Sequence, residues 1–463
     1  MEGQDHPTLS AMLLERFALK NPLAASLRLV LERLFDAKAI NALFEKNRCQ
    51  QYTQQILFVT IVEVMFAVVS RKVDSAHAAM QQQGEALGAS IAAFYKKLNG
   101  TEPAVSTALV AHSFMRGREL VTEMGGLCAE ALPGWRLRIL DGNHLAATER
   151  RLAALWQVSA GPLPGLALVV FDMAARMMSD VILCEDGHAQ ERSLTAQILA
   201  LVARGDCWVA DRNFCTQAIL LGILLRDGAF VIRQHANLPG ELVGPRRACG
   251  RCETGTLFEQ QYQLSFEGET RTVRRVTLVL DAPIRDGEME VHLLTSLPPE
   301  VTAATVAAIY LSRWTIETAF ADLERWLQSE IAPLGYPRAA LLGFCIGVMA
   351  YNAISTLLGA LRATHGEAVV RDQVSGYYIA QFGRDAVGAI DDMIEPEDWV
   401  PWQTLSVPDA AVLLKKIAAR IDLRLIRKHK RGPKKPVPER TRFKKKPHVS
   451  TQRLLDGRTK DPA

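Results

Sequence analysis

The sequence lacks an internal repeat, an N-terminal signal pattern and a complete zinc-binding motif. Residues 1–7 are acidic and polar, so we expect no secretory leader. The eight cysteines are scattered and mostly lie in apolar runs, which indicates reduced thiols in a cytosolic protein. Cys249 and Cys252 have the spacing of half a zinc site, but no second Cys or His pair follows within reach. We therefore interpret these two cysteines as loop residues.

Charge is missing from one long stretch, residues 341–361, which holds no Asp, Glu, Lys or Arg over 21 positions. A helix of that length could cross a bilayer. The stretch also contains Asn352, Ser355 and three glycines, and it closely follows a helix with a polar face. We therefore predict a buried core helix rather than a membrane span.

The formal net charge is only +4, but it is unevenly distributed. Residues 424–446 hold twelve Lys or Arg and one acid, Glu439, so this segment carries +11 and the remainder carries −7. From His429 the chain is rich in Pro, Lys and Arg and has little to bury, which predicts an extended or disordered tail. A nearly neutral body with a basic tail favours a polyanionic partner.

Strands are hard to find in residues 8–116, where apolar residues recur at helical spacing. From Trp135 the pattern alternates between short apolar strands and helices, which predicts an α/β core. The expected strands there are 136–140, 166–171, 181–184, 207–210 and 229–233. Residues 235–296 have period-2 segments typical of a β-rich insertion, and helices resume at Thr302. Residues 410–427 predict a basic amphipathic helix.

Residues 310–328 contain no Gly or Pro and predict one helix. Tyr310, Arg313, Glu317 and Glu324 share one narrow stripe of it, at about 100° per residue. The simple alternative is a solvated polar face with ion pairs. Trp314 and Trp326 lie off the stripe, and we expect both in the core.

Two aspartates, Asp141 and Asp211, each follow a predicted strand. Together with Glu317 they would supply the oxygen ligands that Mg²⁺ prefers at a two-metal phosphoryl-transfer site. The alternatives are a hairpin turn for Asp141 and a helix cap for Asp211. Asp172 and Asp186 also lie at strand ends and are rival ligands. His144 could approach the metals, but we expect a structural hydrogen-bonded histidine.

These motifs resemble the DDE transposases of bacterial insertion sequences. The resemblance covers most of the chain and rests on the ordered set, with the insertion between the second and third acidic motifs. Its motifs are Asp141-Gly142-Asn143, residues 210–214 (ADRNF), Tyr310-x2-Arg313-x3-Glu317 and the tail 431–436 (RGPKKP). The branch with the YREK signature and a β-strand insertion is the most similar.

The resemblance implies an RNase H-like mixed sheet flanked by helices. It also implies two Mg²⁺ ions, replaceable by Mn²⁺, on Asp141, Asp211 and Glu317. Tyr310 and Arg313 would contact DNA phosphates. The segments expected from residue patterns and resemblance together are a helical DNA-binding domain (1–130), a catalytic core (131–234 and 297–365), the β-rich insertion (235–296), a C-terminal helical region suited to dimerisation (366–428) and the basic flexible tail (429–463).

The fourth signature position departs from the family pattern. A lysine is usual there, whereas this chain has Glu324, followed by Arg325, which could partly compensate. With Arg431, Lys434 and Lys435 of the tail, Arg325 completes the predicted DNA contacts.

The sequence thus predicts a cytoplasmic, nucleoid-associated transposase. It would act as a homodimer on double-stranded DNA, at terminal inverted repeats and a target, without a membrane. The alternatives are a nuclease without strand transfer and a non-catalytic DNA-binding repressor.

Overall fold

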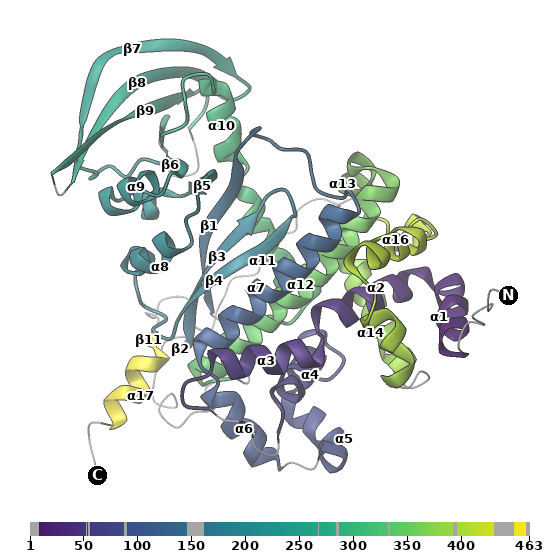
Figure 1. Ribbon diagram of the computed structural model, residues 1–463. Coiled ribbons are helices and arrows are strands. Elements are labelled where there is room, and N and C mark those ends of the chain that lie inside the picture. The colour runs from purple at the N-terminus through teal and green to yellow at the C-terminus, as the bar shows by residue number, and fades with distance from the viewer. Residues whose placement is uncertain are drawn as a thin grey trace.

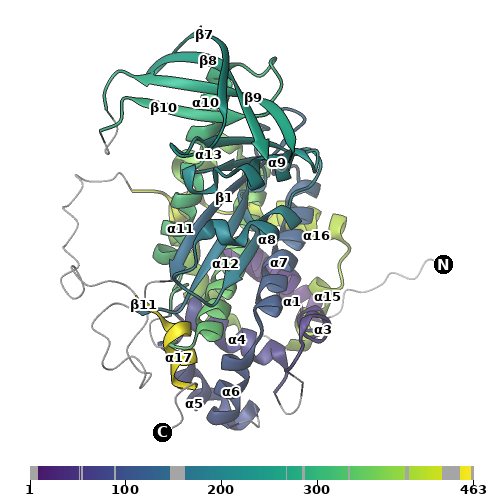
Figure 2. The same cartoon turned by 90° about the vertical axis from the view of Figure 1, so that its left-hand side faces the viewer.

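A computed structural model places most of the chain (Figures 1 and 2). It describes residues 9–51, 53, 56–87, 90–145, 162–266, 268–283, 287–331, 334–391, 396–429 and 449–459. Most of the predicted basic tail, including Arg431, Lys434 and Lys435, lies outside the described residues.

The centre of the fold is a nine-stranded mixed sheet with the order β4-β3-β1-β5-β6-β10-β9-β8-β7. Its first five strands are β1 (Arg136–Leu145), β3 (Gly165–Asp172), β4 (Met177–Cys184), β5 (Asp206–Ala210) and β6 (Ala229–Arg233). β1 pairs antiparallel with β3 and parallel with β5, and β6 extends the parallel part. This is the RNase H-like arrangement predicted from the resemblance.

Strand β3 is buried along its whole length, which explains its continuous apolar sequence. Alternate side chains enter two cores: Ala167 and Val169 face one, and Leu166 and Leu168 face the other. The first core is covered by α7 (Pro103–Glu123) and α12 (Pro337–His365), and the second by α8 (Thr195–Ala200) and α9 (Gln217–Leu224). The sheet is therefore the middle of three layers.

The β-rich insertion continues this sheet instead of forming a separate one. Strands β7 (Glu241–Cys252), β8 (Gly255–Phe266) and β9 (Glu269–Leu280) form a meander, and β10 (Glu290–Thr295) joins it to β6. Figure 1 shows the meander arching away from the helices at the top of the molecule. Because its outer strand β7 has few neighbours, its side chains are largely exposed.

Helix α12 is the one described helix long and apolar enough to cross a membrane, and 94% of its most apolar window is buried inside the protein. Its polar residue Asn352 is satisfied internally. The amide nitrogen of Asn352 donates to Ser113 Oγ and to the Met178 carbonyl, and its Oδ1 accepts from Met178 N. The prediction of a buried core helix is confirmed.

The N-terminal region is helical, as expected, and three of the C-terminal helices pack against it. The N-terminal helices are α1 (Leu9–Lys20), α2 (Pro22–Leu34), α3 (Ala37–Asn47), α4 (Phe58–Val69), α5 (Ala76–Leu87) and α6 (Ile91–Gly100). The C-terminal ones are α13 (Glu367–Gln373), α14 (Gly376–Asp391), α15 (Val400–Gln403), α16 (Val407–Ala418) and α17 (Thr451–Thr459). Of these, α14, α15 and α16 pack against α2. The predicted 410–427 helix ends early, at Ala418, and a short 3-10 turn follows at Leu423–Ile426.

The predicted single helix over residues 310–328 is wrong. Helix α10 (Ala303–Leu311) ends at Ser312, and α11 (Trp314–Trp326) begins after Arg313. The Ser312 hydroxyl donates to the carbonyl of Ile309, and the next turn is held by bonds from Thr315 N to Ser312 O and from Ile316 N to Arg313 O. These three-residue spacings tighten the backbone, so Tyr310 and Glu317 lie on different helices.

Candidate active site

Asp141 lies within strand β1, not at its end as predicted. The parallel pairing of β1 with β5 stops at Leu140 opposite Ala210, but its antiparallel pairing with β3 continues to Leu145. Asp141 is therefore the first residue of β1 beyond the parallel pair. The sequence signal was misleading because a strand can lose one neighbour while it keeps the other.

Arg313 brings two of the predicted carboxylates together. Its Nη1 lies 2.9 Å from Oδ2 of Asp141, and its Nη2 lies 2.7 Å from Oε1 of Glu317. The side chains of Arg313 and Asp141 are only 11% and 16% exposed, so this ion pair is shielded from solvent. The kink between α10 and α11 places Arg313 where one guanidinium spans both acids.

Asp211 directly follows β5, as predicted, and its backbone is extended. Its Oδ1 accepts a hydrogen bond from Asn213 N at 2.8 Å. Because β1 and β5 are parallel neighbours and Leu140 lies opposite Ala210, Asp141 and Asp211 are the next residues along two adjacent strands. The helix-cap alternative also holds in part, since Asp211 caps the short 3-10 turn Arg212–Phe214.

Burial raises the pKa of Asp141 to about 7. The positive charge of Arg313 and the Gly142 N–H act in the opposite direction, while Asp211 and Glu191 raise the pKa further. The raised pKa of Asp141 therefore reflects chiefly the burial of a carboxylate, to which the neighbouring acids add. A cation at this point would lower that pKa.

Glu191 is a further acid of the site that sequence reasoning missed. It begins a 3-10 turn (Glu191–Leu194), and its Oε2 accepts from Asn213 Nδ2 at 3.3 Å. Burial raises its pKa, and Asp211 adds to that effect. Nothing in the local sequence marks Glu191, because it neither ends a strand nor shares a helix stripe with another acid.

Gly142 explains how Glu191 fits beside Asp141. A Cβ atom at position 142 would lie 2.0 Å from Oε1 of Glu191. A side chain at 142 would therefore displace that carboxylate, and the Asp-Gly pair is needed for space instead of for a turn.

Tyr310 lies in the last turn of α10, close to the same cluster. Burial raises the pKa of its hydroxyl, Arg313 and Arg233 oppose this, and Asp211 adds to it. Tyr310 and Arg313 are therefore neighbours, as the predicted phosphate contacts require. In this structure, however, Arg313 contacts carboxylates.

Glu324 lies well along α11 from Glu317 and lines a separate cavity with Arg71 and Arg384. Arg71 donates to the Glu324 backbone carbonyl at 3.0 Å. Arg325 points elsewhere and pairs with Asp322 at 3.3 Å. The structure therefore brings neither residue to Asp141.

The two rival aspartates have other roles. Asp172 is fully buried and accepts from Ala175 N at 2.8 Å, which closes the β3–β4 turn. Asp186 accepts from His188 N and pairs with Arg453 at 2.6 Å. Within the part of the chain that the structure describes, neither forms a hydrogen bond or ion pair with Asp141 or Glu317.

Three further predictions from the sequence can be compared with the structure. His144 Nδ1 lies 3.1 Å from the Gly187 carbonyl, which confirms a hydrogen-bonded structural histidine. Cys249 and Cys252 belong to strand β7, so the loop interpretation is wrong. Trp314 is 58% exposed, so its predicted place in the core is also wrong: the kink at Arg313 turns it outward.

The chemistry of the donor set fits a hard divalent ion such as Mg²⁺, because all of its members are carboxylates. Arg313 already places one cationic group against Asp141 and Glu317. Within the described ranges, no three His, Cys, Asp or Glu side chains are close enough to form a ready metal cage. Arg313 would have to withdraw from at least one carboxylate for an ion to bind both.

Comparison with known proteins gives a match in the segment that contains these site residues. Residues 136–353 match the family model of the transposase DDE domain. The match supports a DDE transposase. It contains Asp141, Asp211 and Glu317, and it spans the nine-stranded sheet, the insertion and the first part of α12.

No curated protein matches the chain. Among solved structures, the chain is similar to the piggyBac transposase in a cryo-EM structure of its synaptic complex with hairpin DNA. The identity is 11% and the TM-score 0.43, with 84% of this chain and 85% of that chain covered.

Proposed function

We propose that this chain is a DDE transposase that cuts and joins DNA at the ends of an insertion sequence by two-metal phosphoryl transfer. The observation that carries the proposal is the convergence of Asp141 and Glu317 on Arg313, with Asp211 beside Asp141. The residues concerned come from separate parts of the chain, and all lie in the DDE-domain segment.

Asp141, Asp211 and Glu317 would hold the Mg²⁺ ions, and Glu191 is placed to assist through a fourth carboxylate. When bound, such ions activate a nucleophilic oxygen and stabilise the leaving one. The chain itself supplies rigidity, since β1 and β5 fix two of the acids. Asn213 orients both Asp211 and Glu191, through its backbone N–H and its side-chain amide.

Arg313 would change partners during the reaction. In this structure its guanidinium neutralises Asp141 and Glu317. A metal held by those carboxylates would compensate their charge, and the Arg313 guanidinium would then be available to donate to a DNA phosphate, beside Tyr310. The same residue would thus both hold Asp141 and Glu317 together and position the substrate.

The proposed substrate is double-stranded DNA at terminal inverted repeats, followed by target DNA. The N-terminal helices and the basic sequence 424–446 would supply contacts to phosphates. We propose a homodimer, because two element ends must be held together, and a cytoplasmic, nucleoid-associated location.

The test is Asp211→Asn in an end-cleavage assay, with Asp186→Asn as the matched control. Both changes remove one carboxylate at a strand end, but only Asp211 adjoins Asp141. Cleavage should vanish in the Asp211 variant and persist in the Asp186 variant, while both still shift end DNA in a gel. Cleavage by Asp211→Asn at the normal rate would reject the site.

A metal-dependent nuclease without strand transfer is the second candidate. It is favoured by Glu324, which stands at the usual lysine position and lies with Arg71 and Arg384 instead of at the site. Precut ends with a free 3′-hydroxyl separate the candidates, because a transposase joins them to target DNA and a nuclease leaves them unjoined.

A further inference from the structure

A cavity of about 680 Å³ lies between helix α11 and the C-terminal half of helix α12, and the catalytic proposal leaves it unexplained. Further walls come from α13, the start of α14 and the turn between β3 and β4. None of the four acids of the candidate active site lines it. A volume of this size falls in the range of small-molecule sites, about 300–1,000 Å³.

Arg176 reaches the cavity from the end of the sheet opposite to the catalytic acids. Strand β3 runs antiparallel to β1, and its residue Val169 pairs with Asp141. Strand β3 continues away from that point and ends at Asp172. The turn that follows ends with Arg176, which lines the cavity. A ligand beside Arg176 would therefore lie apart from the acids.

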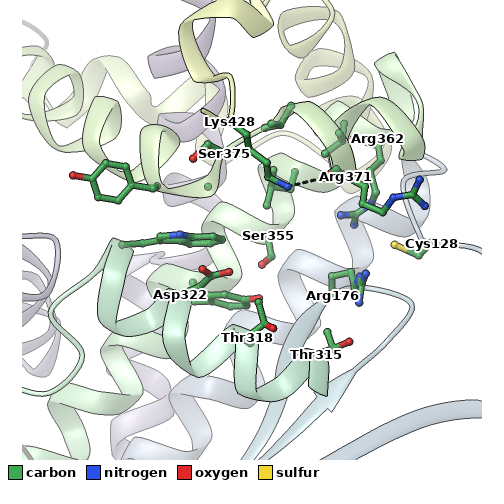
Figure 3. Close-up of a pocket in the computed structure, with 18 of the residues that line it drawn as sticks. Cys128, Arg176, Thr315, Thr318, Asp322, Ser355, Arg362, Arg371, Ser375 and Lys428 are labelled. Atoms are coloured by element: carbon green, nitrogen blue, oxygen red, sulfur yellow. Dashed lines mark hydrogen bonds between the residues drawn. The ribbon is translucent and has the colours of Figure 1, made fainter. Parts of the chain in front are cut away.

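Two arginines at this end of the cavity, Arg176 and Arg362, have no ionic partner within the described ranges. Figure 3 shows both of them beside Cys128. Two other arginines of the lining already form ion pairs, Arg325 with Asp322 and Arg371 with Asp372. The charge available to a ligand is therefore chiefly that of Arg176 and Arg362.

The guanidinium groups of both residues keep N–H donors for a ligand. Arg362 donates from Nε to the carbonyl of Gly126 at 2.8 Å and from Nη2 to that of Ala175 at 3.3 Å. These two bonds hold its side chain in place. Arg176 Nη1 contacts the sulfur of Met173 at 3.9 Å, and a thioether is only a weak acceptor. An arginine has five N–H donors, so both groups can donate to further oxygens.

The positive charge of this pair is incompletely compensated. Burial raises the pKa of the Cys128 thiol, although both arginines oppose this, so the thiol is neutral at pH 7. Burial lowers the pKa of Arg362, and the charge of Arg176 adds to that effect, while Glu367 acts in the opposite direction. One carboxylate thus faces two guanidinium groups that repel each other, and an anion between them would relieve the repulsion.

The backbone of Arg176 indicates that its side chain has a role. Its φ is 61°, a left-handed conformation that is uncommon for residues other than Gly, Asn, Asp and His. Glycine would adopt this conformation without steric cost, so the turn itself does not need an arginine. Strained residues of this kind cluster at ligand-binding sites.

We infer that this end of the cavity binds the phosphate group of a small molecule, with the guanidinium groups of Arg176 and Arg362 donating to its oxygens. Planar guanidinium groups match the spacing of phosphate oxygens and can donate to two of them at once. The same chemistry fits inorganic phosphate and a phosphate ester such as a nucleotide, and the experiment separates the two. The inference does not depend on the proposed function, because the catalytic acids are not part of this site.

Isothermal titration calorimetry with the full chain, in EDTA and at fixed ionic strength, measures the binding of AMP and of inorganic phosphate. EDTA removes metal ions, so phosphate cannot bind to the acids through an ion. Wild type should bind AMP. Equally tight binding of inorganic phosphate identifies the oxyanion alone as the ligand, and weaker binding identifies an ester.

Arg176→Gln should weaken this binding by about tenfold, because it removes a charge-assisted contact to phosphate. Arg226→Gln is the matched control and should bind as wild type does. Arg226 also donates to a backbone carbonyl, that of Gly222, but it is exposed and lies outside the cavity.

Arg176→Gly separates binding from folding. Glycine relieves the left-handed backbone, so the Tm should not fall, whereas binding should be lost as in Arg176→Gln. Asp227→Gly makes the same backbone change at another left-handed position, with φ of 55°, outside the cavity. This control should bind AMP normally.

Several results would overturn the inference. One is that wild type binds neither AMP nor inorganic phosphate, and another is undiminished binding in Arg176→Gly. A third is an equal loss in Arg226→Gln or Asp227→Gly. A fourth is displacement of AMP by a thymidine pentanucleotide with a 5′-phosphate at far lower concentration than by AMP itself, which would assign the site to a DNA end. Asp211→Asn should bind AMP normally, so failure of this site is distinguishable from failure of the catalytic proposal.

Discussion

Replacing Asp141 with Asn should stabilise the metal-free protein while it abolishes DNA cleavage. Folding raises the pKa of Asp141 from 3.8 to about 7, chiefly by burial. At 1.36 kcal/mol per pKa unit this difference corresponds to about 4 kcal/mol. Asn keeps the shape of the side chain and carries no charge, so this cost disappears. In this variant Arg313 keeps only Glu317 as an ionic partner, and the lost ion pair with Asp141 offsets part of the stabilisation. We therefore expect the free energy of unfolding to rise by about 2 kcal/mol in total.

The sign of the pH dependence follows from the raised pKa. Below pH 4 both folded and unfolded chains hold the proton, and Asp141 costs nothing. As pH rises from about 4 to about 7, the unfolded chain loses its proton first, so wild-type stability falls relative to Asp141→Asn. Above pH 7 the difference is constant. Urea unfolding in EDTA at pH 5, 6, 7 and 8 measures it.

Asp186→Asn is a control of opposite sign. Burial would raise the pKa of Asp186, but hydrogen bonds from Ser450, His188 and Arg453 outweigh it, and the pKa is lowered. This variant should therefore be less stable than wild type at pH 7, and the difference should persist down to about pH 4 and shrink only as pH falls further. Excess Mg²⁺ should stabilise wild type but not Asp141→Asn. The reasoning is refuted if Asp141→Asn is less stable than wild type at pH 8, or if its effect does not change with pH.

Three further predictions concern the same region. Gly142→Ala should change the free energy of unfolding little but slow cleavage, because its Cβ would lie 2.0 Å from Oε1 of Glu191, the far end of a flexible side chain that would have to move away. Denaturation and cleavage assays check this, and an unchanged cleavage rate would show that the position of Glu191 does not matter. Glu191→Gln should weaken Mn²⁺ binding measured by electron paramagnetic resonance, whereas equal affinity would show that Glu191 is not part of the metal site. Glu324→Lys should lower the free energy of unfolding by about 1 kcal/mol, because the substituted side chain would face Arg71 and Arg384. It should not improve strand transfer. Faster joining of DNA ends by this variant would show that position 324 belongs to the active site.

The pattern of neighbouring residues along the chain was enough to predict much of the core. The apolar run of β3 predicted a buried strand, and the structure shows it covered on both faces. The uncharged stretch 341–361 was recognisable as a core helix because it contains polar groups such as Asn352 that need internal partners. Both predictions depend on neighbours along the chain, which a sequence displays directly.

The errors arose where distant segments decide the outcome. Asp141 was expected to end a strand, but pairing with β3 extends β1 to Leu145. The kink at Ser312 and Arg313 broke a pattern that looked like one helix, and it exposed Trp314. Glu191 had no local signal, since only its approach to Gly142 and Asn213 brings it to the site.

The sequence by itself determined the types of residue available: acids suited to a hard metal, a basic tail and an ordered set of strands and helices. Composition and periodicity carry that information because they act over a few residues. Only the tertiary structure decided which acids meet. It placed Arg313 between Asp141 and Glu317, added Glu191, and removed Glu324 to a separate cavity. Charges interact through space, and the distances that govern them are fixed by packing between segments far apart in the chain.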